Sequence, residues 1–179
     1  MNPFIRFLKF LRHTVNKLGI DIHLVEKKQH ESAIQLNSEL ISNINWKDPR
    51  KVKKYLTKDR MEFFEEIVKI LQIRSIDIKD KPVADVGCGS GALFRILAEK
   101  LHGNKFVGFD FSGESLKVAE KIFPNAKYIQ HNLYDSYPGN FYLTLCTEVI
   151  EHLIDPEMAL KNLLTLTLSK VKNLIISNI

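Results

Sequence analysis

Three glycines in one short segment form the strongest candidate for a ligand-binding turn. Residues 85–91 read Asp-Val-Gly-Cys-Gly-Ser-Gly, directly after an apolar run and directly before a helical pattern. Glycine permits a tight turn and lets a ligand approach the backbone, because it has no Cβ. The amides of such a turn and of the next helix start can hold an anionic group. The segment therefore predicts a turn that binds a nucleotide-like ligand.

Asp85 distinguishes two classes of ligand for this turn. The spacing of Gly87, Gly89 and Ala92 fits the G-x-G-x-x-A form of the dinucleotide fingerprint, which would bind a pyrophosphate. A carboxylate two residues before the first glycine would repel a diphosphate but attract an ammonium or sulfonium group. Asp85 thus favours a cationic nucleotide, and an NADP-dependent oxidoreductase is the alternative enzyme.

A second acid ends the next apolar run. Asp110 stands 25 residues after Asp85, at the offset where a carboxylate can accept hydrogen bonds from a ribose diol. The alternative is that Asp110 caps the following helix, a role that Ser112 would fill equally well. Phe111 is placed to lie against a purine face. These two residues predict a nucleoside site.

The segment Glu-Val-Ile-Glu-His at 148–152 is a third candidate. On a helical turn Glu148, Glu151 and His152 would share one face. Such a face could bind a divalent cation that polarises an acceptor hydroxyl. The alternatives are that His152 acts as a general base without metal, or that it is a buried structural histidine. We expect no metal, and we expect His152 to be the catalytic residue.

Composition limits the class of protein and its compartment. The 179 residues are 45% hydrophobic and 26% charged, as in one soluble globular domain. Cys88 and Cys146 are too few for a disulfide framework, and glycines and carboxylates beside Cys88 do not favour a thiolate nucleophile. The net charge of +5 is concentrated in residues 1–20, so charge does not indicate a nucleic-acid partner. A reducing, cytoplasmic location is expected.

The elements that must position these residues alternate between strand and helix. Apolar runs predict strands at 83–86, 105–109, 127–130, 141–146 and 173–177, with helices at about 91–101, 113–122 and 156–168. This alternation predicts an α/β fold with a Rossmann-like, doubly wound and mostly parallel sheet. Because ligands bind at the carboxyl ends of such strands, all three candidate groups should meet at one edge.

Helices are also expected before the first strand. Residues 4–18 form an amphipathic pattern with basic residues opposite an apolar face, which would lie on an anionic membrane or pack on the protein itself or on a second subunit. Further helices are expected at 31–44 and 58–73, with a break at 45–49. We therefore divide the chain into an N-terminal helical appendage, residues 1–50, and a ligand-binding domain, residues 51–179.

With these motifs, residues 83–152 resemble a class I S-adenosylmethionine-dependent methyltransferase. The resemblance implies that S-adenosyl-L-methionine is the cofactor and S-adenosyl-L-homocysteine the product. It also implies a role for each motif residue: Asp85, Gly87, Cys88, Gly89 and Gly91 at the methionine end, Asp110 at the ribose, Phe111, Asn132 and Leu133 at the adenine, the backbone of Cys146 near the sulfonium, and Glu148 near the cofactor. The family commonly has Asp where this chain has Asn132, which weakens but keeps an acceptor for the adenine amine.

The resemblance further implies a reaction class. Ubiquinone-biosynthesis O-methyltransferases carry a similar 148–152 segment followed by the same Asp155-Pro156 pair. We expect methylation of an oxygen on a small molecule, lipid or glycan precursor, with the N-terminal helices covering the cofactor or reaching a membrane-bound acceptor. The alternatives are a non-catalytic cofactor-binding module and a metal-assisted RNA 2′-O-methyltransferase, whose further downstream histidine is missing here. The family usually adds two strands after 173–177, so we expect a C-terminally truncated chain or a minimal sheet.

Overall fold

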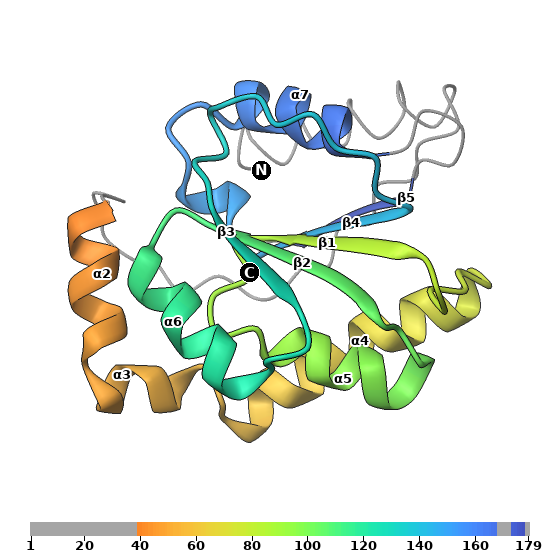
Figure 1. Ribbon diagram of the computed structural model, residues 1–179, viewed down its shortest axis with the longest axis horizontal. Helices are drawn as coiled ribbons and strands as arrows, with labels where there is room; N and C mark the ends of the chain where they lie inside the picture. The colour runs from red at the N-terminus through yellow and green to blue at the C-terminus, as the bar shows by residue number, and fades with distance from the viewer. Residues whose placement is uncertain (1–38, 168–172, 178–179) are drawn as a thin grey trace, which may run out of the picture.

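Five parallel strands form a single sheet in the part of the chain that the structure describes. They are β1 (Pro82–Val86), β2 (Lys105–Asp110), β3 (Lys127–Gln130), β4 (Leu143–Thr147) and β5 (Asn173–Ser177). Their spatial order is β3-β2-β1-β4-β5, so the direction of winding reverses between β1 and β4 (Figure 1). Ligand crevices form at the carboxyl ends of strands at such a reversal. The expected α/β, Rossmann-like fold is confirmed.

The computed structural model describes residues 39–167 and 173–177. Its helices are α2 (Glu39–Lys47), α3 (Pro49–Lys54), α4 (Lys58–Ile73), α5 (Ala92–Leu101), α6 (Gly113–Ile122) and α7 (Pro156–Leu166), with a short 3-10 helix η1 (Ile150–His152). The predicted helix at 4–18 lies outside the described residues, as does most of the one at 31–44. That second helix extends to Lys47 instead of ending at residue 44, and Asp48 caps α3 by accepting from the Arg50 amide at 2.9 Å. The division at residue 50 stays a prediction.

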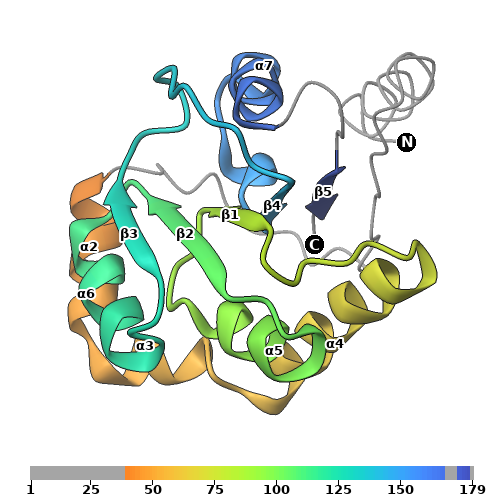
Figure 2. The ribbon, with the colours of Figure 1, turned by 45° about the vertical axis from the view of Figure 1, so that its right-hand side comes forward.

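Two hydrophobic clusters cover the two faces of the sheet. Because side chains alternate along a strand, Val83 and Leu145 point to the α4 and α5 side, whereas Ala84 and Cys146 point to the α7 side. Figure 2 shows α7 above the sheet and α4 and α5 below it. Burial on both faces explains why the strands read as continuous apolar runs in the sequence.

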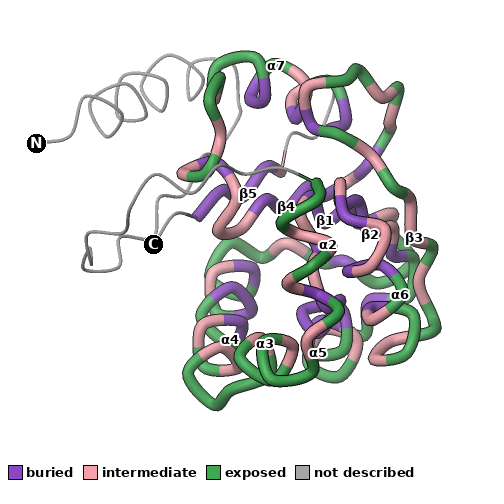
Figure 3. The backbone as a smooth tube through the Cα atoms, turned by 90° about the vertical axis from the view of Figure 1, so that its left-hand side faces the viewer, coloured by how far each residue is buried: buried purple, intermediate pink, exposed green. Residues whose placement is uncertain are grey.

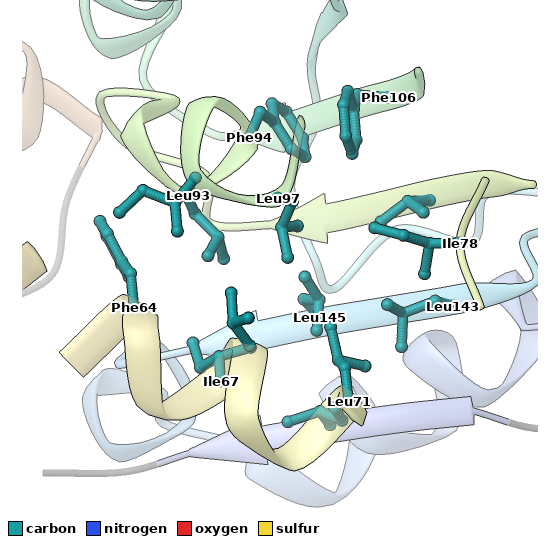
Figure 4. Packing of buried hydrophobic residues seen from close by; sticks show 14 of the residues in the cluster. Phe64, Ile67, Leu71, Ile78, Leu93, Phe94, Leu97, Phe106, Leu143 and Leu145 are labelled. Atoms are coloured by element: carbon teal, nitrogen blue, oxygen red, sulfur yellow. The ribbon is translucent and has the colours of Figure 1, made fainter. Parts of the chain in front are cut away.

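Helix α4 shows how an amphipathic pattern becomes a layer of this fold. Its buried residues recur every three or four positions, and they are Phe64, Ile67, Val68 and Leu71. Figure 4 shows Ile67 and Leu71 pointing toward Leu143 and Leu145 of β4, with Leu93 and Leu97 of α5 completing the layer. The helix therefore begins near the carboxyl ends of the strands in a fixed orientation.

Helix α2 lies beside α6, beyond the carboxyl ends of the strands (Figure 1). Asn43 Oδ1 accepts from the Ser112 hydroxyl at 2.6 Å and from the Glu114 amide at 3.3 Å. The Gln130 side-chain amide donates to Glu39 at 2.9 Å, and the Trp46 ring is buried. Polar contacts and one buried ring thus hold α2 against the sheet edge where ligands bind in this fold.

Removing a core side chain from α4 tests this packing. Leu71 is fully buried, whereas Ile73, two residues later, is 83% exposed. We expect Leu71→Ala to lower the free energy of unfolding by about 2–5 kcal/mol, because it leaves a cavity in a packed layer. The matched variant Ile73→Ala should change it by less than about 0.5 kcal/mol. Urea unfolding followed by circular dichroism measures both, and equal losses would contradict the described packing.

Candidate functional site

A cavity of about 300 Å³ opens at the carboxyl ends of β1, β2 and β4. Its walls come from two distant parts of the chain, the helices before β1 and the loops after the strands. The lining residues are Ile41, Ser42, Asn45, Trp46, Tyr55, Arg60, Phe64, Asp85, Gly87, Cys88, Gly89, Ser90, Asp110, Phe111, Thr147, Glu148, Val149 and His152. All three groups of residues that the sequence singled out therefore meet in one cavity.

The glycine turn after β1 forms one wall of this cavity. The amides of Gly87 and Cys88 both donate to the Phe109 carbonyl, at 2.7 and 3.0 Å, which ties the turn to the end of β2. Gly87 has a φ of +78°, a left-handed conformation that a residue with a Cβ adopts only with strain. A Cβ there would also overlap Val149 Cγ2 from the loop after β4. The turn needs glycine for its own shape and for the close approach of Val149.

Asp85 is the least satisfied polar group of the site. Its side chain is only 3% exposed, and Oδ1 has no hydrogen-bond partner among the described residues. Burial, reinforced by the nearby negative charge of Asp110, raises the pKa of Asp85 to about 7. A buried carboxylate oxygen without a donor is unfavourable unless a ligand supplies one. Since Asp85 lines the cavity, the arrangement suits a cationic donor.

Asp110 is held differently from Asp85. Its two carboxylate oxygens accept from the amides of Gly89 and Ser112, each at 2.9 Å. Burial raises the pKa of Asp110, and the two amide hydrogen bonds partly oppose this shift. Ser112 is the N-cap of α6, because its hydroxyl accepts from the Ser115 amide at 3.2 Å. Asp110 is therefore not needed as a cap, and its carboxylate is oriented toward the cavity by backbone donors.

Glu148 joins the loop after β4 to helix α4. Its carboxylate forms an ion pair with Arg60, and its amide donates to the Ser177 carbonyl of β5 at 3.1 Å. Glu148 has a φ of +57°, a conformation that costs a non-glycine residue roughly 1–2 kcal/mol. The Arg60 guanidinium also lies 5.7 Å from the centroid of the Tyr55 ring. The two contacts of Glu148 hold the strained turn in place.

The 148–152 segment does not form the single helical turn that the spacing predicted. Glu148 is left-handed, and only residues 150–152 form the 3-10 helix η1. The three side chains therefore do not share the face that a metal site on an α-helix would need. Among residues 39–167 and 173–177, no three His, Cys, Asp or Glu side chains are grouped so as to hold a metal ion. His152 nonetheless lines the main cavity.

A second cavity of about 260 Å³ shares Phe111 with the first. Its lining residues are Glu39, Phe111, Gln130, His131, Asn132 and Asp135. Asn132 Oδ1 accepts from the Tyr134 amide at 3.0 Å, which fixes the side-chain amide at the end of β3. Phe111 is thus common to two cavities, one lined by Asp85 and Asp110 and one by Asn132.

Three residues assigned to the cofactor from the resemblance line neither cavity. Gly91 has a φ of +68°, and a Cβ there would lie 2.7 Å from the Tyr128 hydroxyl and 3.1 Å from Ala119 of α6, so this glycine serves the shape of the turn and close packing. Leu133 and Cys146 are buried in the cluster on the α7 side. Burial raises the pKa of both thiols, those of Cys88 and Cys146, which agrees with cysteines that are not nucleophiles.

The helices before β1 contribute a wall that the motifs did not indicate. Trp46 lies over the glycine turn, since a Cβ on Gly89 would be 3.2 Å from its ring. The Trp46 and Tyr55 rings stack with centroids 4.3 Å apart, and Tyr55 in turn lies beside Arg60. One residue in the sequence could have indicated this wall. Arg60 is a basic residue within the amphipathic pattern of 58–73, and in the structure its side chain is partly buried instead of solvated.

With this geometry in view, the chain can be compared with known proteins. Residues 84–168 match the family model described as a methyltransferase domain. This match covers slightly less than half of the chain, and it supports a class I S-adenosylmethionine-dependent methyltransferase. Ubiquinone biosynthesis O-methyltransferases of Idiomarina loihiensis and Thiobacillus denitrificans are 35% identical to this chain over 88 residues and 33% identical over 97 residues. The matches cover 45% and 48% of this chain but 35% and 41% of those relatives, so the chain spans about two fifths of their length.

Solved methyltransferase structures share the fold. The N-methyltransferase NodS from Bradyrhizobium japonicum, in complex with S-adenosyl-L-homocysteine, has a TM-score of 0.60 at 14% identity, over 72% of this chain and 67% of that one. The magnesium protoporphyrin IX methyltransferase from Synechocystis, with bound S-adenosylmethionine, has a TM-score of 0.58 at 18% identity, over 76% and 74%. At these identities the likeness establishes the class I fold.

Replacing Asp85 should change how stability depends on pH. Its folded-state pKa of about 7 lies above the value of 3.8 for an ordinary Asp, so the folded protein keeps a proton that the unfolded chain loses between these values. Stability therefore falls as pH rises from about 4 to 7. We expect Asp85→Asn to be more stable than the parent at pH 8, by on the order of 3 kcal/mol, and similar to it near pH 4.

Chemical denaturation at several pH values measures this effect. The exposed Asp77 gives a matched variant, Asp77→Asn, which should leave the pH profile of the parent unchanged. In Asp85→Asn, stability should still fall with rising pH but less steeply, because burial also raises the pKa of Asp110. If Asp85→Asn kept the full slope of the parent, Asp85 would not titrate as its burial requires.

Shape at the glycine turn can be tested separately from charge. Gly87→Ala should lower the free energy of unfolding by about 3 kcal/mol, through the left-handed backbone and the overlap with Val149. Adding Val149→Ala should recover part of that loss, because it removes the overlapping methyl group. Gly113→Ala, at a glycine whose φ is not positive, serves as the control with a small effect. Simple additivity of the two substitutions would show that Gly87 and Val149 do not meet.

Proposed function

We propose that this chain binds S-adenosyl-L-methionine in the main cavity and transfers its methyl group to an oxygen of a small-molecule or lipid acceptor. The observation that carries the proposal is the buried Asp85 oxygen, which lines the cavity and lacks a donor among the described residues. The cofactor's ammonium group would supply that donor and its positive charge. A pyrophosphate would instead meet two buried carboxylates, Asp85 and Asp110, which disfavours a dinucleotide.

The other cavity residues fit the remaining parts of the cofactor. Each oxygen of Asp110 accepts one backbone amide and retains capacity to accept a ribose hydroxyl. Phe111 borders both cavities, so the adenine would lie against its ring and reach Asn132 in the second one. Asn132 Oδ1 keeps one acceptor site beyond its bond from Tyr134. Gly91, Leu133 and Cys146 would act from behind this surface, as support for the turn and strand ends.

When bound, the cofactor supplies a methyl group on a sulfonium, which an acceptor oxygen takes by direct displacement. The residues of this chain then have three tasks. Trp46, Tyr55 and Phe64 line the cavity and would shield the reacting atoms from water. The Arg60 and Glu148 ion pair fixes the turn that carries His152. His152 would accept the proton of an acceptor hydroxyl, the task that a general base performs at neutral pH.

The acceptor proposal rests on the relatives. Curated proteins that match this chain are named ubiquinone biosynthesis O-methyltransferases. An oxygen acceptor agrees with His152 at the cavity wall, since hydroxyl attack requires loss of a proton. A phenolic ring of moderate size would suit a cavity with aromatic walls.

Cofactor binding should depend on pH through Asp85. A cationic ligand binds the ionised carboxylate, so its affinity should fall about tenfold per pH unit below pH 7 and level off above it. Isothermal titration with S-adenosyl-L-methionine measures this profile, and Asp85→Asn should bind weakly at every pH. NADPH serves as the competing ligand and should give no heat. Tight NADPH binding, or S-adenosyl-L-methionine binding that ignores Asp85→Asn, would refute the assignment.

Catalysis should depend on His152 more than binding does. We expect His152→Ala to lower turnover about 10²–10⁴-fold with a hydroxylated phenol acceptor while cofactor affinity stays within a factor of about two. His102→Ala, at an exposed residue remote from the cavity, is the matched control and should keep full activity. An equal loss of cofactor affinity in His152→Ala would make His152 a binding or structural residue. Tight cofactor binding without turnover on any hydroxyl acceptor would favour a non-catalytic binding module.

A further inference from the structure

Helix α2 presents three different faces. Glu39, Asn43 and Trp46, at i, i+4 and i+7, contact the body of the protein. Ile41, Ser42 and Asn45 line the main cavity. Leu40, Ile44 and Lys47, shifted by one residue from the first group, form the outer ridge of the helix, and the two aliphatic side chains are 69% and 56% exposed. The outer ridge therefore exposes large apolar groups next to the cavity.

Helix α3 continues this ridge with positive charge. Residues 47–58 contain six Lys or Arg and one acid, Asp48. Asp48 is bonded to Arg50 at 3.0 Å, Lys47 is paired with Glu114 at 3.9 Å and Lys58 with Glu62 at 3.5 Å. In the part of the chain that the structure describes, no carboxylate pairs with Lys51, Lys53 or Lys54, and all three residues are exposed.

Together these residues make one mixed surface, here called the α2–α3 surface: Leu40, Ile44, Lys47, Lys51, Lys53 and Lys54. Figure 3 shows α2 and α3 on the same face of the molecule, with exposed residues along both. Exposed aliphatic groups beside lysines, three of which have no carboxylate partner in the described part of the chain, match the interface of an anionic bilayer, where apolar side chains enter the headgroup region and cations face lipid phosphates. A nucleic-acid site would use the lysines but would leave Leu40 and Ile44 in water.

We propose that the α2–α3 surface docks this methyltransferase on an anionic membrane. No described helix is long and apolar enough to cross a bilayer, so the contact is a surface contact. Docking through the outer ridge would bring the cavity within about one helix diameter, roughly 10 Å, of the headgroups, because α2 lines that cavity with its other side. Delivery of a membrane-held acceptor to the cavity rests on the proposed function, whereas docking itself does not.

A label on the ridge tests the docking at the residue level. Both cysteines of the chain are buried, so Ile44→Cys in the full chain can be labelled with a polarity-sensitive nitrobenzoxadiazole dye. We expect vesicles of equal parts phosphatidylcholine and phosphatidylglycerol to raise its emission and shift it to the blue. Ile73→Cys, exposed at the far end of α4, is the matched control and should not respond. Pure phosphatidylcholine should give little change at either position.

Charge removal completes the test. Replacing Lys51, Lys53 and Lys54 with Gln should weaken the vesicle response at Ile44→Cys about 100-fold in lipid concentration, at roughly fivefold per lysine. The control replaces Lys81, Lys100 and Lys105, exposed at the opposite end of the sheet, and should keep the response.

No response at Ile44→Cys to anionic vesicles overturns the proposal, whether or not the chain sediments with them. A response to RNA alone would assign the surface to nucleic acid instead. Cofactor titration of the same variants, expected to be unchanged, separates failure of docking from failure of the proposed function.

Discussion

The site depends on a carboxylate buried at the end of the central strand. Asp85 stands in β1 opposite Gly108 of β2 and Leu145 of β4, so strands on both sides exclude water from it. An ionised carboxylate in such a place is unfavourable without a hydrogen-bond donor. No described residue donates a hydrogen bond to Asp85 Oδ1. Burial therefore raises the pKa of Asp85 to about 7, and a cationic ligand would favour its ionised form. A buried carboxylate at this position disfavours a phosphate group in the cavity.

The rest of the cavity is built around that carboxylate by segments far apart in the sequence. Backbone amides orient Asp110, and the glycine turn is tied to Phe109. The helices before β1 then close the opposite side, with Arg60 bridging α4 to the turn at Glu148. A strained turn is held at this point by an ion pair from another element, so the geometry near His152 depends on the position of α4. The helices before the sheet are thus part of the site as well as a cover for it.

The sheet and its motifs could be predicted from sequence because their signals are local. Strand β3 and helix α6 begin and end where the apolar runs and caps indicate. The turn at Gly87 is marked by closely spaced glycines, which a left-handed turn favours. The wall formed by Trp46, Tyr55 and Arg60 could not be predicted, because an amphipathic pattern says that one face is buried but not what the other faces meet. The prediction that Glu148, Glu151 and His152 share one helical face was wrong for a similar reason. The helical spacing assumed ordinary φ values, and Glu148 does not have one.

The indole of Trp46 has a practical consequence. It is the one tryptophan of the whole sequence, and it lies between the glycine turn and the Tyr55 ring at the wall of the main cavity. Any ligand that enters will change the polarity and quenching around this ring. Intrinsic fluorescence of the unmodified chain, excited selectively at the indole, will therefore report occupancy of the cavity directly. Binding curves for cofactor, product and acceptor can be recorded in this way without attaching a dye or altering a residue.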